Sequence, residues 1–213
     1  MTMATFFCPE KQEFLLSQND YLEAARYIGY SKMRLPDDII MQMIKKACEK
    51  LLEVIKPQSV FEEFDLALKI KNEKNEISFA DVSFDSKDLS RNLQQCDSVY
   101  LMACTIGPQV DSIIRREQTI DAAMAAVLQG AGAMFIEKLV DLTNLQIKTD
   151  AQKKGRITKP RYSPGYGDVP LSCQKDFFRL LPCTRIGLTL MDTLIMAPEK
   201  SVTAYVGSYQ KNI

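Results

Sequence analysis

The sequence contains no histidine. Imidazole is the side chain most often used as a general base, a metal ligand or a proton shuttle near neutral pH. Without it the chain cannot build a serine–histidine–aspartate triad, a cysteine–histidine pair or a zinc site of the H-E-x-x-H type. The absence therefore excludes the commonest hydrolytic mechanisms.

Net charge is also missing, because Lys and Arg number 27 and Asp and Glu number 27. Without an overall positive field, binding to nucleic acid would need a strongly local patch. No run approaches the roughly 18 to 20 apolar residues that span a bilayer, and the opening MTMATFFCPEKQEF has no basic segment before an apolar core. We expect a cytoplasmic protein that binds neither nucleic acid nor membrane.

The cysteines form no C-x-x-C pair, and the chain has no G-K-S or G-K-T phosphate-binding motif. Several cysteines lie in apolar stretches, where a thiol behaves as a small hydrophobic group. Reduced, buried cysteines are therefore favoured over a metal or redox site. The cysteines are Cys8, Cys48, Cys96, Cys104, Cys173 and Cys183.

What is present is the composition of a folded domain. The chain has 213 residues, of which 46% are hydrophobic and 25% charged. This balance suits one domain with a sizeable core, and no internal repeat or linker divides it. We predict a single domain over residues 1–213, in which residues 1–35 are an N-terminal helical extension.

Hydrophobic periodicity places the main elements. Helical turns are predicted over 10–30 and a helix over 35–56, with Pro36 in its first turn. Apolar or alternating runs at 59–70 and 76–84 predict a two-stranded ribbon joined by the polar turn KNEKNE, and a short helix follows from Ser86. The continuous apolar run SVYLMACTIG predicts a central strand.

The longest periodic stretch predicts a helix from Thr119 to about Lys148. A second face of this helix carries Gly130, Ala133, Glu137 and Asp141, small residues beside acidic ones, and could admit a ligand. The GAGAMF sequence on it lacks the third glycine and the preceding strand of a dinucleotide fingerprint, so close helix packing is favoured. The first face carries Ile120, Met124, Val127, Leu128, Ala131, Phe135, Leu139 and Leu142.

A short helix over 172–181 and two or three strands over 186–207, broken by Pro198, complete the chain. The order of elements predicts an α+β fold. We expect a mainly antiparallel, twisted sheet flanked by helices, one of them long and central.

The segment KPRYSPGYGDVPLS, residues 159–172, cannot be a helix or a regular strand. Its prolines fix φ and its glycines permit φ values that other residues avoid, so the backbone is shaped before any ligand binds. Such a loop can aim Arg161 at a carboxylate, and Tyr162 and Tyr166 add flat apolar faces. A tight structural turn with a surface arginine explains the same pattern equally well.

Basic residues cluster between Lys148 and Arg161, with Asp150 as their acidic exception. Charges at the end of a long helix commonly complement its dipole and remain solvated. A docking patch for an acidic partner is the alternative. The solvated interpretation is favoured.

RYSPGYGD at 161–168, followed by RIGLTL and MAPEKSVTAYVG, resembles the activation domain of cobalamin-dependent methionine synthase, particularly its free-standing bacterial form. The resemblance extends upstream through YIGY, DLSRNLQQCDSVYLMACTIGPQVD and AVLQGAGAMFIEKLVD, and so covers nearly the whole chain in order. It implies the fold of that domain and a site for S-adenosylmethionine.

The resemblance implies a role in repair. In that family the domain holds S-adenosylmethionine over an oxidised cob(II)alamin while a flavodoxin-like or ferredoxin-like donor supplies an electron, and methyl transfer traps the reduced cobalt. Since this chain has no D-x-H-x-x-G corrinoid segment, the cobalamin is expected on a separate, corrinoid-bearing methionine synthase polypeptide. The chain itself would be an accessory subunit without catalytic residues or a metal site.

The resemblance also implies site residues. Arg161 matches the arginine that binds the methionyl carboxylate, Tyr166 matches the tyrosine of the motif, and Pro164 and Gly165 line the pocket. Glu137 lies near a glutamate of the family's long helix, and Tyr162 is added from the loop pattern. An acidic residue near the start of the family's domain corresponds to one of Glu13, Asp20 and Glu23.

Two alternatives remain open. The chain could be an interaction module for a corrinoid protein, with weak or no binding of S-adenosylmethionine. It could also serve another corrinoid methyltransferase, such as one that acts on methoxylated or methylamine substrates.

Overall fold

A computed structural model describes residues 3–71 and 74–210. Its main sheet has seven strands in the order β4-β3-β2-β5-β9-β6, with β1 beside β2, and β7 pairs separately with β8. The pairs among these described strands are antiparallel. The strands are β1 (Thr5–Phe7), β2 (Gln58–Lys71), β3 (Lys74–Phe79), β4 (Val82–Asp85), β5 (Ser98–Thr105), β6 (Arg156–Thr158), β7 (Thr189–Leu190), β8 (Met196–Ala197) and β9 (Ser201–Gln210).

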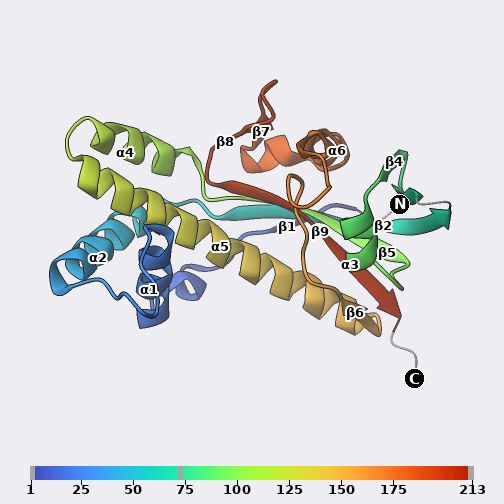
Figure 1. Ribbon diagram of the computed structural model, residues 1–213, viewed down its shortest axis with the longest axis horizontal. Helices are drawn as coiled ribbons and strands as arrows, with labels where there is room; N and C mark the ends of the chain where they lie inside the picture. Colours follow the sequence, from blue (N-terminus) through green and yellow to red (C-terminus); the bar gives the residue numbers. More distant parts are fainter. Residues whose placement is uncertain (1–2, 72–73, 211–213) are drawn as a thin grey trace.

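Helices cover both faces of this sheet (Figure 1). One buried cluster joins α1, α2, α4 and α5 to one face, and a second joins α3, α6 and the β3–β4 hairpin to the other. The α-helices are α1 (Gln18–Tyr27), α2 (Asp38–Leu52), α3 (Lys87–Asn92), α4 (Pro108–Gln118), α5 (Ala122–Lys153) and α6 (Gln174–Leu180), and the short 3-10 helices are η1 (Lys11–Phe14), η2 (Leu171–Cys173) and η3 (Cys183–Ile186). The expected α+β fold, with a mainly antiparallel sheet and one long helix, is confirmed.

Strand β5 lies at the centre of the sheet, between β2 and β9. Each of its residues is buried, as its continuous apolar sequence predicts. Tyr100 and Met102 enter the cluster under α5, whereas Val99 and Leu101 enter the cluster under α6, because successive side chains of a strand point to opposite faces. One strand therefore joins two separate cores.

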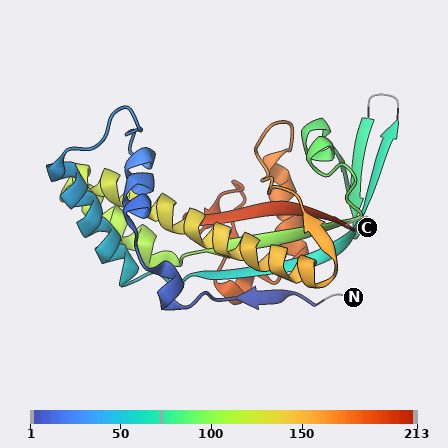
Figure 2. The ribbon, with the colours of Figure 1, turned by 90° about the horizontal axis from the view of Figure 1, so that it is seen from below.

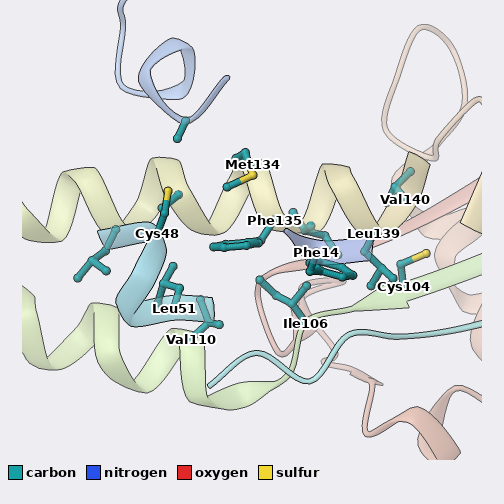
Figure 3. Close-up of a cluster of buried hydrophobic side chains, with 14 of the residues drawn as sticks. Phe14, Cys48, Leu51, Cys104, Ile106, Val110, Met134, Phe135, Leu139 and Val140 are labelled. Atoms are coloured by element: carbon teal, nitrogen blue, oxygen red, sulfur yellow. The ribbon is translucent and has the colours of Figure 1, made fainter. Parts of the chain in front are cut away.

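Helix α5 runs the length of the domain along one face of the sheet (Figures 1 and 2). In Figure 3 its Phe135 and Leu139 lie among side chains from α2, α4 and β5, and Phe135 stacks on Phe14 with ring centroids 6.3 Å apart. By length and composition α5 could cross a membrane, but 61% of its most apolar window is buried inside the domain. Burial in the core explains this apolar character.

Helix α2 follows its predicted apolar stripe, and Ile44, Ala47 and Leu51 are fully buried. The helix begins at Asp38 rather than Pro36, because the Asp37 side chain caps it by accepting a hydrogen bond from the Ile40 N–H at 2.8 Å. A carboxylate at this position satisfies an N–H group that the helix cannot.

The long helix begins later than predicted. It starts at Ala122, and Asp121 caps it by accepting hydrogen bonds from the N–H groups of Ala123 and Met124, both at 3.0 Å. Ile120, assigned to the apolar face, lies in the turn after α4 and is 65% exposed. The start was predicted three residues early because Ile120 has the spacing of the apolar face that follows it.

Two expectations for the first half were incomplete. Residues 76–84 form two strands and not one, since Ala80 adopts a φ of 48° and turns β3 back into β4. Ala80 and Asp81 form the turn between the two strands. The first 35 residues were expected to be helical but begin with β1, which pairs with β2. Part of the predicted KNEKNE turn lies outside the described residues.

Candidate functional site

A cleft of about 560 Å³ opens along one edge of β9, within the usual range for small-molecule sites of about 300–1,000 Å³. Its walls come from α5, the loop between β6 and α6, the start of α6, and β8 and β9. The lining residues are Glu137, Arg161, Tyr162, Ser163, Pro164, Tyr166, Gly167, Gln174, Met196, Ser201, Val202 and Thr203.

The cleft exists because one edge of β9 is covered only in part. From Ser201 to Ser208, β9 pairs with β5. Its other edge pairs with β6 at Ser208–Gln210 and with Tyr162 at Tyr205. From Thr203 back to Ser201, no described strand pairs with that edge. Strand edges offer unpaired backbone groups, so this stretch supplies polar contacts as well as side chains.

The loop over 159–172 is neither helix nor regular strand apart from its Tyr162 bridge and the start of η2, as predicted, and its own hydrogen bonds make it rigid. The Gly165 N–H donates to the Val169 carbonyl at 2.9 Å, and the Val169 N–H donates to the Tyr166 carbonyl at 3.1 Å. Gly165 has a φ of 87°, which a residue with a Cβ rarely adopts. The expected pre-shaped backbone is present.

Asp168 fixes this loop to α3. Its carboxylate accepts hydrogen bonds from the Ser86 hydroxyl at 2.5 Å and from the backbone N–H groups of Lys87 at 2.7 Å and Asp88 at 3.2 Å. The hydrogen bond from Ser86 lowers the pKa of Asp168, and the two N–H groups lower it further. Together they outweigh partial burial, which acts to raise it. The carboxylate thus satisfies the first N–H groups of α3 and anchors the far end of the cleft-lining loop.

Arg161 lies at the wall of the cleft and is bound to α5 by two carboxylates. Its Nη2 donates to Glu137 Oε2 at 2.9 Å and its Nη1 donates to Asp141 Oδ1 at 2.6 Å. Burial acts to lower the pKa of the guanidinium, but the hydrogen bond to Asp141 and the charges of both carboxylates raise it above its ordinary value. One cation between two anions gives the group a net negative charge.

A second cleft, of about 440 Å³, lies on the other side of this group and shares Glu137 and Arg161 with the first. Asp20 and Glu23, two candidates for an acidic ligand-binding residue, line only this second cleft. Asp20 pairs with Lys138 at 3.0 Å and Glu23 with Arg26 at 2.5 Å. Glu13 lines neither cleft and caps η1.

The structure gathers the predicted site residues at one place. Glu137, Arg161, Tyr162, Pro164 and Tyr166 all line the first cleft, although α5 and the loop are far apart in the sequence. Tyr166 stands at its rim and is 70% exposed. Gly165 lies outside the lining, and its contribution is the turn described above.

Gly130 does not leave room for a ligand. A Cβ at this position would lie 2.7 Å from Ile28 Cγ2 and 2.8 Å from the Ala24 carbonyl oxygen, so the missing side chain allows α1 to pack against α5. The helix-packing interpretation of GAGAMF is confirmed. The expectation that this small residue belongs to a ligand-binding face is wrong.

The lining residues that the sequence did not predict include two buried polar ones, Gln174 and Thr203. Gln174 begins α6 and shares the face of the buried Phe177. A polar residue on the apolar stripe of a helix was the available signal. Thr203 gave no signal, since threonine is common in strands.

The basic segment from Lys148 to Arg161 is largely neutralised within the domain. Lys154 pairs with Glu63 at 2.6 Å, and Arg156 pairs with Asp97 and Glu63. Lys153 pairs with Asp150 at 3.0 Å. With these charges paired, the segment offers little free positive surface to an acidic partner.

The cysteines are free, and all except Cys8 are buried. Burial raises the pKa of Cys48, Cys104 and Cys183 to about 12 in each case, so these thiols remain protonated near neutral pH. In the part of the chain that the structure describes, no group of His, Cys, Asp and Glu side chains could hold a metal ion. The interpretation of the cysteines as reduced core residues agrees with this placement.

The chain is similar in fold to a solved structure, the MetH reactivation domain bound to AdoHcy. The TM-score is 0.64 at 14% sequence identity, and the match covers 99% of this chain and 80% of that chain. No protein-family model and no curated protein matches the chain. The similarity establishes the fold of a methionine synthase reactivation domain.

Proposed function

We propose that this chain binds S-adenosylmethionine as the reactivation subunit of a cobalamin-dependent methionine synthase carried on a separate polypeptide. One observation carries the proposal. Side chains from α5 and from the loop between β6 and α6, chosen on their sequence pattern, meet around one cleft of suitable size. The solved domain of similar fold binds AdoHcy, the demethylated product of the same ligand.

The charges around Arg161 suit this ligand. S-adenosylmethionine carries an ammonium, a sulfonium and a carboxylate, and is cationic overall. The net negative group of Glu137, Arg161 and Asp141 complements that charge. Arg161 has five N–H donors, of which the two ion pairs use only part, and its remaining donors can meet the carboxylate. Glu137 would face the ammonium.

The chain supplies position and electrostatics and no proton transfer. A cobalamin held by the partner provides the chemistry once the sulfonium methyl is presented to it, and a flavodoxin-like or ferredoxin-like protein provides the electron. The protein's own residues bind the amino-acid headgroup at one end of the cleft and leave the exposed Tyr166 at the rim where a partner would approach.

Calorimetric titration with S-adenosylmethionine and S-adenosylhomocysteine tests the proposal. We expect binding of both, and a loss of about 100-fold for Arg161→Ala, because a charge-assisted bidentate contact is removed. Arg179→Ala is the matched control, since Arg179 pairs with Asp81 and does not line the cleft. Unchanged affinity in Arg161→Ala contradicts this assignment of the headgroup site.

An interaction module without ligand binding is the second candidate. The observation that favours it is the engagement of Arg161 by both Glu137 and Asp141. A pull-down with the corrinoid-bearing synthase, with and without S-adenosylmethionine, separates the two. The reactivation subunit should bind the synthase more strongly when the ligand is present, whereas the module should bind equally in both cases and take up no ligand.

A further inference from the structure

Two polar side chains line the cleft and are almost completely buried, and one oxygen atom of each has no hydrogen-bond partner. Gln174 is 6% exposed and its Oε1 is unpaired, and Thr203 is 2% exposed and its Oγ1 is unpaired. Buried polar atoms are paired in most folded proteins, because leaving one unpaired forfeits its hydration without compensation. Two such atoms in one cleft indicate a hydrogen-bonding ligand.

Both side chains lie on the same side of β9. Thr203 and Tyr205 point to the same face, being two residues apart on a strand. Tyr205 packs against Phe177 of α6 with ring centroids 4.7 Å apart, and Gln174 is the first residue of that helix. The fully buried Phe177 fixes the helix, and so fixes where the Gln174 side chain starts.

The cleft therefore has two chemically different ends. On the α5 side of the β9 edge lies the charged group of Glu137 and Arg161, and on the α6 side lie the neutral Gln174 and Thr203. Along β9, Thr203 is two residues from the Tyr162 bridge, a distance of about 7 Å at ~3.3 Å per residue. An ionic headgroup joined to a neutral polar ring fits this layout.

We propose that Gln174 and Thr203 bind the base of an S-adenosyl ligand, with Gln174 Oε1 accepting a hydrogen bond from the exocyclic amino group of adenine and Thr203 bonding a ring nitrogen. The inference rests on the proposed function and assigns residues to the end of the cleft opposite Arg161. An acceptor at Gln174 makes the site selective for an aminopurine, since the carbonyl of an oxopurine would place two acceptors together.

The test compares S-adenosylhomocysteine with S-inosylhomocysteine, in which a carbonyl replaces the 6-amino group of the base and N1 carries a proton. Wild type should prefer the adenosyl compound by about tenfold or more, as expected when a mismatch leaves buried polar groups unpaired. Gln174→Met should lose the preference and Thr203→Val should weaken both compounds. The unfolding temperature of Gln174→Met should be unchanged or higher, because an unpaired atom is removed.

If Gln174→Met loses selectivity between the two compounds but keeps its stability, Gln174 has a binding role and not a structural one. Equal binding of the two compounds by wild type, or a preference that survives in Gln174→Met, overturns the inference while the proposed function stands. If wild type binds neither compound, both the inference and the proposed function are overturned. The comparison on wild type alone decides the matter should a variant fail to fold.

Discussion

Arg156 and Arg161 lie close together in the sequence but have opposite surroundings. The Arg156 side chain is 11% exposed and is held by Asp97, Glu63, Ser98 and the Ser208 hydroxyl and carbonyl. The Arg161 side chain is 33% exposed, is held by two carboxylates from a single helix, and lies beside a cleft.

The difference lies in how many donors the fold has already used. Arg156 closes the end of the sheet, because its partners come from β2, β5, β9 and the turn before β5. Arg161 keeps donors facing open space. The residue type is the same at the two positions, so the number of unused donors beside a cavity is the better guide to a binding role.

Replacement of both arginines should separate stability from binding most clearly. Arg156→Ala should lower the free energy of unfolding by about 3 kcal/mol, because it removes a largely buried guanidinium that bonds the buried Ser98 and Ser208 and pairs with Glu63 and Asp97. Arg161→Ala should lower it by about 1 kcal/mol or less, since its pairs are partly exposed. Urea denaturation of both variants measures the contrast. Equal losses would show that Arg161 is a structural residue too.

Acid should weaken the Arg156 region. Burial acts to raise the pKa of Glu63, but hydrogen bonds from Lys154, Ser98 and Tyr100 hold it below the ordinary value of 4.5. A carboxyl group whose pKa is lowered by folding stabilises the protein above its ordinary pKa and loses that contribution as the pH falls through the folded value. The stability advantage of wild type over Glu63→Gln should therefore shrink between about pH 5 and pH 3. A constant difference across that range contradicts the prediction.

Asp141 offers the smallest and sharpest test. It holds Arg161 but lines only the second cleft, whereas Glu137 lines both. Asp141→Asn should lower affinity by about threefold, because it removes one negative charge from the group while its amide oxygen can still accept from Arg161, whereas Glu137→Gln should lower it further by also weakening the contact to the ammonium. Titration of the two variants with S-adenosylmethionine provides a matched pair. A loss in Asp141→Asn as large as that in Glu137→Gln would show that the Asp141 carboxylate also contacts the ligand.

Most of the fold followed from local patterns. The burial of β5, the stripe of α2 and the length of α5 come from apolar spacing that each element carries in its own sequence. The start of α5 was predicted three residues early, at Thr119 instead of Ala122, and the β3–β4 turn was missed. Ala80 takes a positive φ without being glycine, so no residue type marked that turn.

For the candidate site too, local features could be predicted from the sequence, whereas contacts between distant segments could not. Arg161 and its loop were found because prolines and glycines restrict the backbone locally. The engagement of Arg161 by α5 was not foreseen, because it depends on the approach of a helix distant in the sequence. Gln174 and Thr203 acquire their meaning only when α6 packs beside the open stretch of β9, and no spacing within either element could show that.

The cleft opens at the edge of a sheet, so a ligand bound there has one side exposed to solvent. Such a site is poorly suited to catalysis by this domain alone, since the domain encloses a bound ligand on one side only. It is well suited to presenting a ligand to a second macromolecule. That macromolecule would complete the enclosure and exclude water during transfer of the methyl group. The partial covering of β9 would thus make the chemistry depend on assembly.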